Sequence, residues 1–562
     1  MTLLQQLAVM GVAALSLSAA AAETLTINLK PAKGDACASF SRAIERARRH
    51  NGPVEINLAP GVYNLSHDKA TARKYRISNT ASATEHPTSL KHVGLLIKGI
   101  DNLTITGGGK ATLLTHGEMT PWVIDSCTNI VFKGLIINAA DPTTPEATIT
   151  ERTDSTLTVS VNPDAEYEIR NGKLYWKGYG WEFTDGIAQV YFPDTDVTLR
   201  CASPVADAVR AEEIKPGTVR FFFRGGAPDY RPGCTYHFRH SYRREAGGFI
   251  NRSNNVAFMD MQFAFTANFG VVGQFSKNIT FTDCRFAPLE DSGRTNAAYA
   301  DFVHLSSCAG HVKVSGCYFA GSHDDDINIH GTHQQIVEAS PKELKLRYMH
   351  PQTFGFLAYT AGDTIEIVNP HTLMPLERGV VADARMTDEY HTVVTLREPL
   401  SDASGIVGMV VDNITWYPTV EIRDNTFSRM PTRGILLTSR RSALIEGNRF
   451  MRCPMPAILI ADDARSWYES GRVTDVVIRE NIFVECSSPV IDIAPENDVI
   501  GGYVHGGIRI EGNEFVGSAG ATLKARSVDG LSIDRNKVVS PYGEERELTV
   551  DVTSSTAVTI NE

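Results

Sequence analysis

Short stretches of alternating apolar and polar residues recur along the chain at regular intervals. The repeated phrase is apolar–x–apolar, two further residues, then usually Asn or Cys, one residue and a Phe or Val, as in VEIRDNTF, VVIRENIF and IRIEGNEF. It closes at positions 263, 286, 319, 427, 450, 483, 515 and 538, which are steps of 23, 33, 108, 23, 33, 32 and 23 residues. Alternation with a period of two predicts short strands with one buried face.

This period predicts a solenoid. Coils of 23 residues, some enlarged by ten, are typical of a parallel β-helix, in which each coil stacks on the next at the inter-strand distance of roughly 4.8 Å. The recurring Asn or Cys at one turn predicts an internal ladder of like side chains. We therefore expect an all-β fold, a right-handed parallel β-helix.

The pattern changes near the start of the chain. In DACASFSRAIERARRH, Phe40, Ala43, Ile44 and Ala47 stand at helical spacing, which predicts an amphipathic helix. The strand-like VEINLAPGVYNL follows it. Because a solenoid must cover its open apolar end, this helix is expected to be the N-terminal cap.

Two regions interrupt the repeat. They hold alternating strands such as KLYWKGYGWEF and DTIEIVNP, of antiparallel character, and the coils resume after each region. Both are predicted to be small β-barrel-like domains inserted into the solenoid. The expected organisation is cap and first coils at 23–145, an insert at 146–243, central coils at 244–333, a second insert at 334–414 and final coils at 415–562.

The first residues predict a secretory signal peptide at 1–22. An apolar stretch from Leu7 to Leu17 precedes small residues suited to cleavage near Ala22, although no Lys or Arg stands before it. No later segment approaches the length of a membrane span. We expect an exported protein, periplasmic or extracellular. The inserted domains could support a homodimer.

Composition narrows the range of partners. The net charge is -11, and no basic run stands out, which argues against nucleic acid or an anionic membrane as the main partner. The nine cysteines lack CxxC spacing, so neither a zinc site nor a disulfide framework is indicated.

An acidic run stands directly before one of the predicted strands, in GSHDDDINIHG at 321–331. When the buried residues of DFVHLS and DINIHG are matched, Val303 falls over Ile327, an offset of 24 residues. Asp301 then falls over Asp325, with Asp324 beside them. Three acids in one patch should raise the pKa of at least one of them.

The same alignment predicts an outward-facing set. It pairs Phe302 with Asp326, His304 with Asn328 and Ser306 with His330. The next coil, PTRGILLTS, matches with Ile435 over Ile327 and brings Arg433 beside Asp325, where a cation would hold that acid ionised. We expect Asp326, His304, Asn328, His330 and Arg433 to contact a sugar.

An acid with a raised pKa beside an ionised carboxylate is what glycoside hydrolysis needs. One carboxyl donates a proton to the leaving oxygen, and the other activates water or attacks. Two other readings of the acidic run stay open: a solvated surface turn, and a Ca²⁺ site with oxygen ligands.

The acid block carries a resemblance to known families. DFVHL and HDDDINI resemble the three-acid arrangement of polygalacturonase-type β-helix hydrolases. A fuller match is to glycoside hydrolase family 110, carried by APGVYNL, by the loop KYRISNTASATEHPTSLKHVGLLIKG at 74–99, by two inserted barrels and by DFVHL with HDDDINIHGTH. The resemblance covers nearly the whole mature chain.

That resemblance implies hydrolysis of terminal α-1,3-linked galactose with inversion, on blood group B-type or linear Galα1-3Gal glycans. It implies that Asp324 is the general acid and that Asp301 and Asp325 are bases flanking the attacking water. Asp326 could replace Asp324 or bind the sugar. No cofactor and no metal are expected.

Three alternatives stay open. A polysaccharide lyase would use a Lys or Arg base, usually with Ca²⁺ bridging uronates, but no lysine appears in the aligned strands. A polygalacturonase-like hydrolase of acidic polysaccharides would want a basic groove, and only Arg433 stands near the acids. A non-catalytic carbohydrate-binding solenoid would have no reason to stack three acids beside an arginine.

Overall fold

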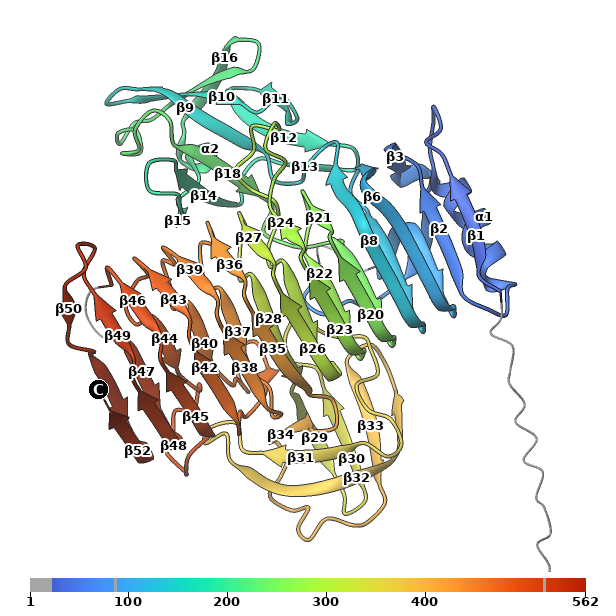
Figure 1. Ribbon diagram of the computed structural model, residues 1–562, viewed down its shortest axis with the longest axis vertical. Coiled ribbons are helices and arrows are strands. Elements are labelled where there is room, and N and C mark those ends of the chain that lie inside the picture. The colour runs from blue at the N-terminus through green and yellow to red at the C-terminus, as the bar shows by residue number, and fades with distance from the viewer. Residues whose placement is uncertain (1–22, 85–87, 519–521, 562) are drawn as a thin grey trace, which may run out of the picture.

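The computed structural model describes residues 23–84, 88–518 and 522–561 (Figure 1). The predicted signal peptide at 1–22 lies outside these residues. The described chain forms a parallel β-helix, as the repeat predicts, with two smaller β domains attached to it.

The coils build three ladders of parallel strands. The first ladder runs in order through β1 (Leu25–Leu29), β2 (Val54–Leu58), β6 (Asp101–His116), β8 (Thr128–Ala139), β20 (Asn254–Met259), β23 (Lys277–Thr282), β26 (Ala309–Ser315), β35 (Pro418–Arg423), β38 (Ala443–Glu446), β42 (Val476–Arg479), β45 (His505–Glu511), β48 (Val528–Asp534) and β52 (Thr556–Asn561).

A second ladder carries the closing residue of each repeated phrase. It runs through β3 (Gly61–Ser66), β6, β8, β21 (Gln262–Phe263), β24 (Arg285–Phe286), β27 (Tyr318–Ala320), β36 (Thr426–Ser428), β39 (Arg449–Met451), β43 (Ile482–Val484), β46 (Glu514–Val516) and β49 (Lys537–Val539).

The third ladder carries the acidic block. It runs through β5 (Leu90–Lys98), β7 (Thr120–Asp125), β19 (Gly248–Asn251), β22 (Val271–Gln274), β25 (Val303–Ser306), β28 (Ile327–Thr332), β37 (Ile435–Leu437), β40 (Ile458–Ile460), β44 (Ile491–Ile493), β47 (Leu523–Arg526) and β51 (Val550–Thr553).

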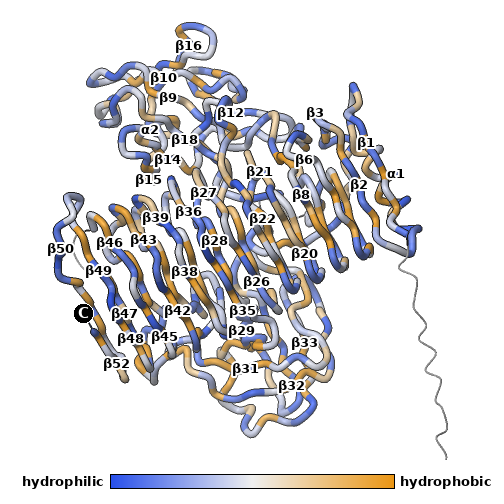
Figure 2. Tube along the Cα trace, viewed as in Figure 1, coloured by the Kyte–Doolittle hydropathy of each residue, from blue (hydrophilic) through white to orange (hydrophobic). Residues whose placement is uncertain are grey.

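Like side chains stack through the interior. Phenylalanine rings of successive coils lie nearly parallel, with centroids 4.7 Å apart for Phe427 and Phe450 and 4.9 Å apart for Phe450 and Phe483. The predicted polar ladder is present too: Asn448 Nδ2 donates to Asn481 Oδ1, and Asn481 Nδ2 donates to Asn513 Oδ1, each at 2.9 Å. The tube coloured by hydropathy shows the alternation along each strand (Figure 2).

The predicted cap helix is α1 (Cys37–Arg48). Phe40, Ala43, Ile44 and Ala47 are buried on one of its faces, as their spacing predicts. They join the same hydrophobic core as the first coils, so the helix covers the apolar end of the solenoid (Figure 1).

The first inserted domain leaves the solenoid after β8. Its larger sheet has seven strands in the order β15 (Val197–Cys201), β14 (Ile187–Phe192), β18 (Thr235–Arg239), β9 (Glu146–Arg152), β10 (Thr156–Val161), β17 (Thr218–Phe222) and β16 (Arg210–Lys215). A smaller sheet holds β11 (Glu166–Arg170), β12 (Lys173–Gly178) and β13 (Trp181–Phe183). Its core is separate from that of the solenoid.

The second inserted domain is a closed barrel. Its strands are β29 (Gln334–Ala339), β30 (Glu343–Arg347), β33 (His391–Leu396), β32 (Pro375–Met386), β31 (Thr364–Val368) and β34 (Val410–Asn413). The two inserted domains lie at opposite ends of the strands of the solenoid (Figure 1).

All nine cysteines are free thiols, and eight of them are buried. Among the described residues, no helix is long and apolar enough to cross a membrane.

Candidate active site

A cavity of about 270 Å³ opens over the third ladder, at the coils of β25, β28, β37 and β40. Residues far apart in sequence meet there: the loop before β5, the first inserted domain and the enlarged coil between β40 and β42. The polar and aromatic side chains that line it are Asn79, Arg200, Arg243, Asp301, Asp324, Asp325, Asn328, Thr438, Arg433, Asp463, Trp467, Glu469 and Glu496.

The strand register under this cavity is the one that the sequence predicts. Val303 pairs with Ile327, His304 with Asn328 and Ser306 with His330. In the next coil Ile327 pairs with Ile435. This register brings Asp301, Asp324 and Asp325 to one wall of the cavity.

Asp324 accepts hydrogen bonds from two arginines that the sequence alignment did not single out. Arg200 Nη2 donates to Oδ1 at 3.0 Å, and Arg243 Nη2 donates to Oδ2 at 3.2 Å. Burial acts to raise the pKa of Asp324, but the guanidinium groups of Arg243, Arg200 and Arg433 outweigh it and bring the pKa below its ordinary value.

Asp325 has the predicted contact with Arg433. The guanidinium donates from Nε to Oδ1 at 2.7 Å and from Nη2 to Oδ2 at 2.9 Å, and the Thr432 hydroxyl donates to Oδ1 at 2.8 Å. Burial nevertheless raises the pKa of Asp325 above its ordinary value, with Arg433 acting against that rise.

Asp301 is the third carboxyl of the cluster. Burial raises its pKa well above the ordinary value, and the negative charges of Asp324 and Asp325 add to the rise, while Arg243 opposes it. The expectation that crowding raises at least one carboxyl pKa is therefore met, at Asp301 and Asp325 rather than at Asp324.

The predicted outward position of Asp326 is wrong. Asp326 is fully buried and does not line the cavity, and its partner in the alignment, Phe302, packs in the hydrophobic core against Phe286 with ring centroids 5.5 Å apart. Both residues precede the first paired residue of their strands, so the alternation does not extend to them. Burial raises the pKa of Asp326 well above its ordinary value, which favours the neutral acid.

The polar residues predicted to face outward lie at two different depths. Asn328 lines the cavity, whereas His304 and His330 are buried beneath its floor. The two histidines therefore reach the site through Asp301 and Glu469 rather than through a direct opening. His304 Nδ1 lies 2.9 Å from Asp301 Oδ2, and His330 Nε2 lies 3.7 Å from Glu469 Oε1.

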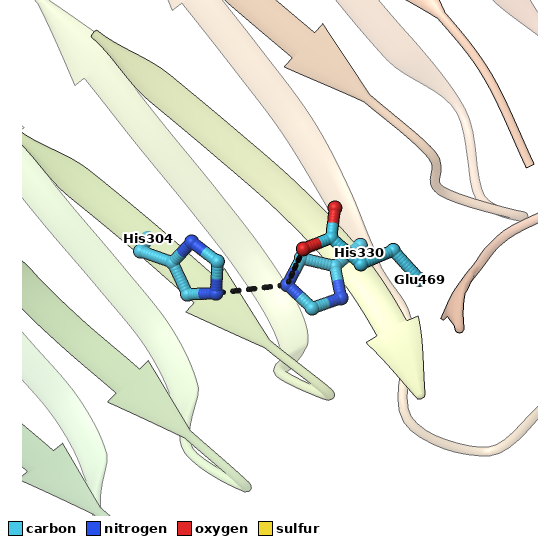
Figure 3. Close-up of side chains that lie close together, drawn as sticks. All are labelled: His304, His330 and Glu469. Carbon is cyan, nitrogen blue, oxygen red and sulfur yellow. Dashed lines mark hydrogen bonds and ion pairs between the residues drawn. The ribbon is translucent and has the colours of Figure 1, made fainter. Parts of the chain in front are cut away.

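Figure 3 shows His304, His330 and Glu469 converging, a grouping of side chains that can ligate metals. The two Nε2 atoms are 2.9 Å apart, which is a hydrogen-bond distance. Zinc bound by histidine nitrogens at about 2.0–2.1 Å in a tetrahedron would hold them roughly 3.4 Å apart. The distance describes a hydrogen bond between the rings.

Several site residues were not identified from sequence. Arg200 comes from β15 of the first insert and Arg243 from the segment that follows it, so no strand alignment could place them. Glu469 and Trp467 belong to the segment ADDARSWYESG between β40 and β42, which lies outside the aligned strands of the repeat. Asn79, in the loop before β5, donates to Glu469 Oε1 at 3.3 Å.

A pair or cluster of carboxylates lining a small cavity is the arrangement that glycoside hydrolysis uses. Family models describe three parts of the chain: GLAA-B beta-barrel domain I matches residues 145–233, GLAA-B beta-barrel domain II matches 343–405, and a right handed beta helix region matches 407–539.

Curated relatives that match most of the chain show the family to which it belongs. The chain is 41% identical over 524 residues to alpha-1,3-galactosidase A of Bacteroides thetaiotaomicron, with 92% of each chain covered. It is 34% identical to alpha-1,3-galactosidase A of Akkermansia muciniphila, covering 86% of this chain and 81% of that protein. The B. thetaiotaomicron alpha-1,3-galactosidase B is 30% identical, with 97% and 91% covered. The chain belongs to the α-1,3-galactosidase family of glycosidases.

Solved structures with the same fold are distant. The exopolygalacturonase of Thermotoga maritima superposes with a TM-score of 0.40 at 10% identity, covering 94% of each chain. The tailspike of E. coli bacteriophage HK620 has a TM-score of 0.41 at 12% identity, covering 95% of this chain and 64% of that one.

Proposed function

We propose that this α-1,3-galactosidase is exo-acting and inverting, and that it releases terminal α-1,3-linked galactose from blood group B-type or linear Galα1-3Gal glycans. The observation that carries the proposal is the set of three carboxylates on one wall of a single cavity. Its volume of about 270 Å³ is just below the range of drug-sized ligand sites, about 300 to 1,000 Å³. A cavity of that size suits one terminal sugar.

The proposed proton donor is Asp324. Its side chain is 18% exposed, against 6% for Asp301 and 3% for Asp325, and a donor must reach the glycosidic oxygen of a sugar in the cavity. Asp301 and Asp325 lie deeper and are proposed to orient and deprotonate the attacking water. Inversion requires that this water stand between acid and base.

The charges around the carboxylates favour a second assignment of proton donor and base. Arg200 and Arg243 keep Asp324 ionised, whereas Asp301 holds its proton. If the proton stays in place when the galactoside binds, Asp301 donates it and Asp324 activates water. Both assignments use the same cluster with one proton, so they predict the same reaction and the same products.

The proposed sugar contacts come from side chains that reach the cavity. Asn328 and Arg433 keep the binding roles expected of them, since both line it. Trp467 is added, because this residue lines the cavity and is 43% exposed, and an indole ring offers an apolar face for stacking on a sugar. Asp326 is not proposed as a sugar contact, because it is buried and does not line the cavity.

Export and assembly complete the proposal. The apolar N-terminal stretch supports export to the periplasm or beyond, where intact glycans are met. Edman sequencing of the purified secreted form would begin after Ala22. Light scattering on the same sample gives the oligomeric state, for which a homodimer is proposed.

The first experiment follows the anomeric proton of released galactose by NMR, with Galα1-3Gal and its α1-2-fucosylated form as substrates. Immediate release of β-galactose supports an inverting α-galactosidase. Immediate release of α-galactose would refute inversion, and no galactose from either substrate would refute the proposed substrate class.

A second experiment separates the two assignments of acid and base. Asp324→Asn and Asp301→Asn are each assayed on Galα1-3Gal and on an aryl α-galactoside whose leaving group needs no proton. The variant that lacks the donor keeps most of its activity on the aryl substrate and loses about 10²–10⁴-fold on the disaccharide. The variant that lacks the base loses activity on both.

A further inference from the structure

Beneath the cavity floor, four groups form one continuous chain of hydrogen bonds. His330 Nδ1 lies 2.5 Å from the backbone carbonyl of Gly331, and His330 Nε2 lies 2.9 Å from His304 Nε2 (Figure 3). At the other end, His304 Nδ1 lies 2.9 Å from Asp301 Oδ2. The chain therefore connects a catalytic carboxyl to a backbone carbonyl through two imidazole rings.

The fixed acceptor at one end determines the protons along the chain. A carbonyl oxygen can only accept, so His330 Nδ1 must carry a proton. In a neutral His330, Nε2 is then an acceptor, and His304 Nε2 must donate to it. In a neutral His304, Nδ1 is then also an acceptor. The group that faces it, Asp301 Oδ2, must be a protonated carboxyl that donates.

Two other arrangements satisfy the same contacts. One has an imidazolium at His304 beside an Asp301 carboxylate, and the burial of His304 disfavours it. In the second, the proton reaches His330. If the Asp301 proton passes to His304 Nδ1, the proton on His304 Nε2 passes to His330 Nε2. Asp301 is then a carboxylate, His304 stays neutral with its tautomer reversed, and His330 is an imidazolium. Glu469 Oε1, 3.7 Å from His330 Nε2, would be the counter-ion. No proton is gained or lost, because each bond broken is matched by one formed.

We propose that His304 and His330 are a proton relay that keeps one proton between Asp301 and His330 and so sets whether Asp301 is an acid or a base. At rest the proton is on Asp301. The inference rests on the proposed function, and it supplies what that function needs, since Asp301 can become a base without releasing its proton to solvent. His304 is thus a positioning residue, acting through Asp301.

The surroundings favour the resting arrangement. His304 is fully buried against the Phe269 ring, with centroids 4.8 Å apart, and burial together with His330 and Arg243 lowers its pKa well below the ordinary value. An imidazolium at His304 is therefore disfavoured, and the proton passes through this ring without staying on it.

Apart from Arg243, which also acts on His304, the other charges act at the two ends of the hydrogen-bond chain. Asp324, Asp325 and Arg243 act on Asp301, and so does Glu469. Glu469 is held by amide donors, Asn79 Nδ2 to Oε1 and Asn328 Nδ2 to Oε2, each at 3.3 Å. The Glu469 carboxylate is therefore positioned to stabilise a positive charge on His330.

The direct test is the ring tautomers of the substrate-free enzyme, read from ¹⁵N chemical shifts of labelled histidine near pH 7. The expected result is His330 protonated at Nδ1 and bare at Nε2, and His304 protonated at Nε2 and bare at Nδ1. Asp301→Asn should keep both tautomers, because the amide nitrogen donates where the carboxyl did. His304 protonated at Nδ1 in the resting wild type would overturn the proposal.

Metal content is measured on the same sample by elemental analysis. The expected result is less than one tenth of an equivalent of any transition metal per chain, before and after incubation with Zn²⁺. A stoichiometric ion together with bare Nε2 atoms on both rings would overturn the relay and assign a metal site.

The kinetic test interrupts the chain of hydrogen bonds at two residues. His304→Asn keeps a polar partner beside Asp301 but does not reach His330, and His330→Gln leaves the Asp301–His304 contact in place. Each should lower kcat by ten- to a hundredfold with little change in KM, and should shift the alkaline limb of the pH profile. His311→Gln is the control, since this histidine is half exposed on β26.

Unchanged kcat and pH profiles in both folded variants would overturn the relay. Galactose release by the wild type tests the proposed function separately, and no release would refute it. The ring tautomers can be measured whether or not galactose is released.

Discussion

The guanidinium of Arg433 contacts both carboxylate oxygens of Asp325, from Nε to Oδ1 at 2.7 Å and from Nη2 to Oδ2 at 2.9 Å. The two residues are 108 positions apart in sequence, on either side of the second inserted domain, yet they belong to neighbouring coils. The side chain of Asp325 is 3% exposed and that of Arg433 is 21% exposed, so the pair is shielded from water.

Replacing Arg433 tests this contact. Arg433→Ala leaves a buried carboxylate without its cation and should lower the free energy of unfolding by about 3–5 kcal/mol. Arg433→Lys should recover part of the stability but not the two-point contact, and the displaced Asp325 should cost on the order of 10²-fold in kcat. Urea unfolding and steady-state kinetics measure the two effects.

Arg452→Lys is the matched control, because Arg452 contacts Glu485 in an exposed ion pair with 31% and 46% of the side chains accessible. It should change stability by less than about 1 kcal/mol. Equal losses of unfolding free energy in the control and in Arg433→Lys would contradict the importance of the buried two-point contact between Arg433 and Asp325.

The pH dependence of kcat/KM should be bell-shaped with a displaced alkaline limb. Activity rises with pH as Asp324, whose pKa is low, and then Asp325 lose their protons, and it falls when Asp301 loses its own proton, well above the ordinary carboxyl pKa of about 4. The shape is the same for either assignment of donor and base, since the active form has one proton. A fall in activity centred near pH 4 would contradict the raised pKa of Asp301.

Removing Arg200 should move the acid limb. Arg200 is one of the two arginines on Asp324, so Arg200→Gln removes a cation and lets the pKa of Asp324 rise. The acid limb of kcat/KM should shift to higher pH, and the pH profile is the measurement. Arg220→Gln, on β17 of the same inserted domain, pairs with Glu151 and should leave the profile in place. An unshifted limb in Arg200→Gln would show that Asp324 does not control it.

The asparagine ladder predicts a stability effect far from the cavity. Asn481 donates to Asn513 Oδ1 and to the Ile445 carbonyl, and its Oδ1 accepts from Asn448, so Asn481→Ala leaves several buried groups without partners. Each such group costs about 1–3 kcal/mol. Chemical denaturation should show the loss, while galactose release at low temperature stays near the wild-type rate.

Glu514→Ala is the control for the ladder, because Glu514 is exposed on β46. It should change the free energy of unfolding by no more than about 0.5 kcal/mol. A similarly small loss in Asn481→Ala would mean that water replaces the ladder.

Where sequence reasoning was right, the information was local and periodic. The stacking of Asp301 and Asp325 follows from aligning two strands one coil apart, because neighbouring coils of a β-helix repeat the same backbone path. The same argument placed Arg433 across an intervening domain. It was wrong for Asp326, because this residue precedes the strand and the turn directs its side chain inward.

The sequence by itself therefore determined the solenoid, its cap helix, its two interruptions and the three stacked acids, since each depends on a period or on a break in one. Only the tertiary structure decided in which direction the pKa of each acid is shifted. That depends on Arg200 and Arg243 approaching Asp324 from outside the coils, and on His304 and His330 meeting beneath Asp301. Burial and charge act through space, and no spacing along the chain encodes them.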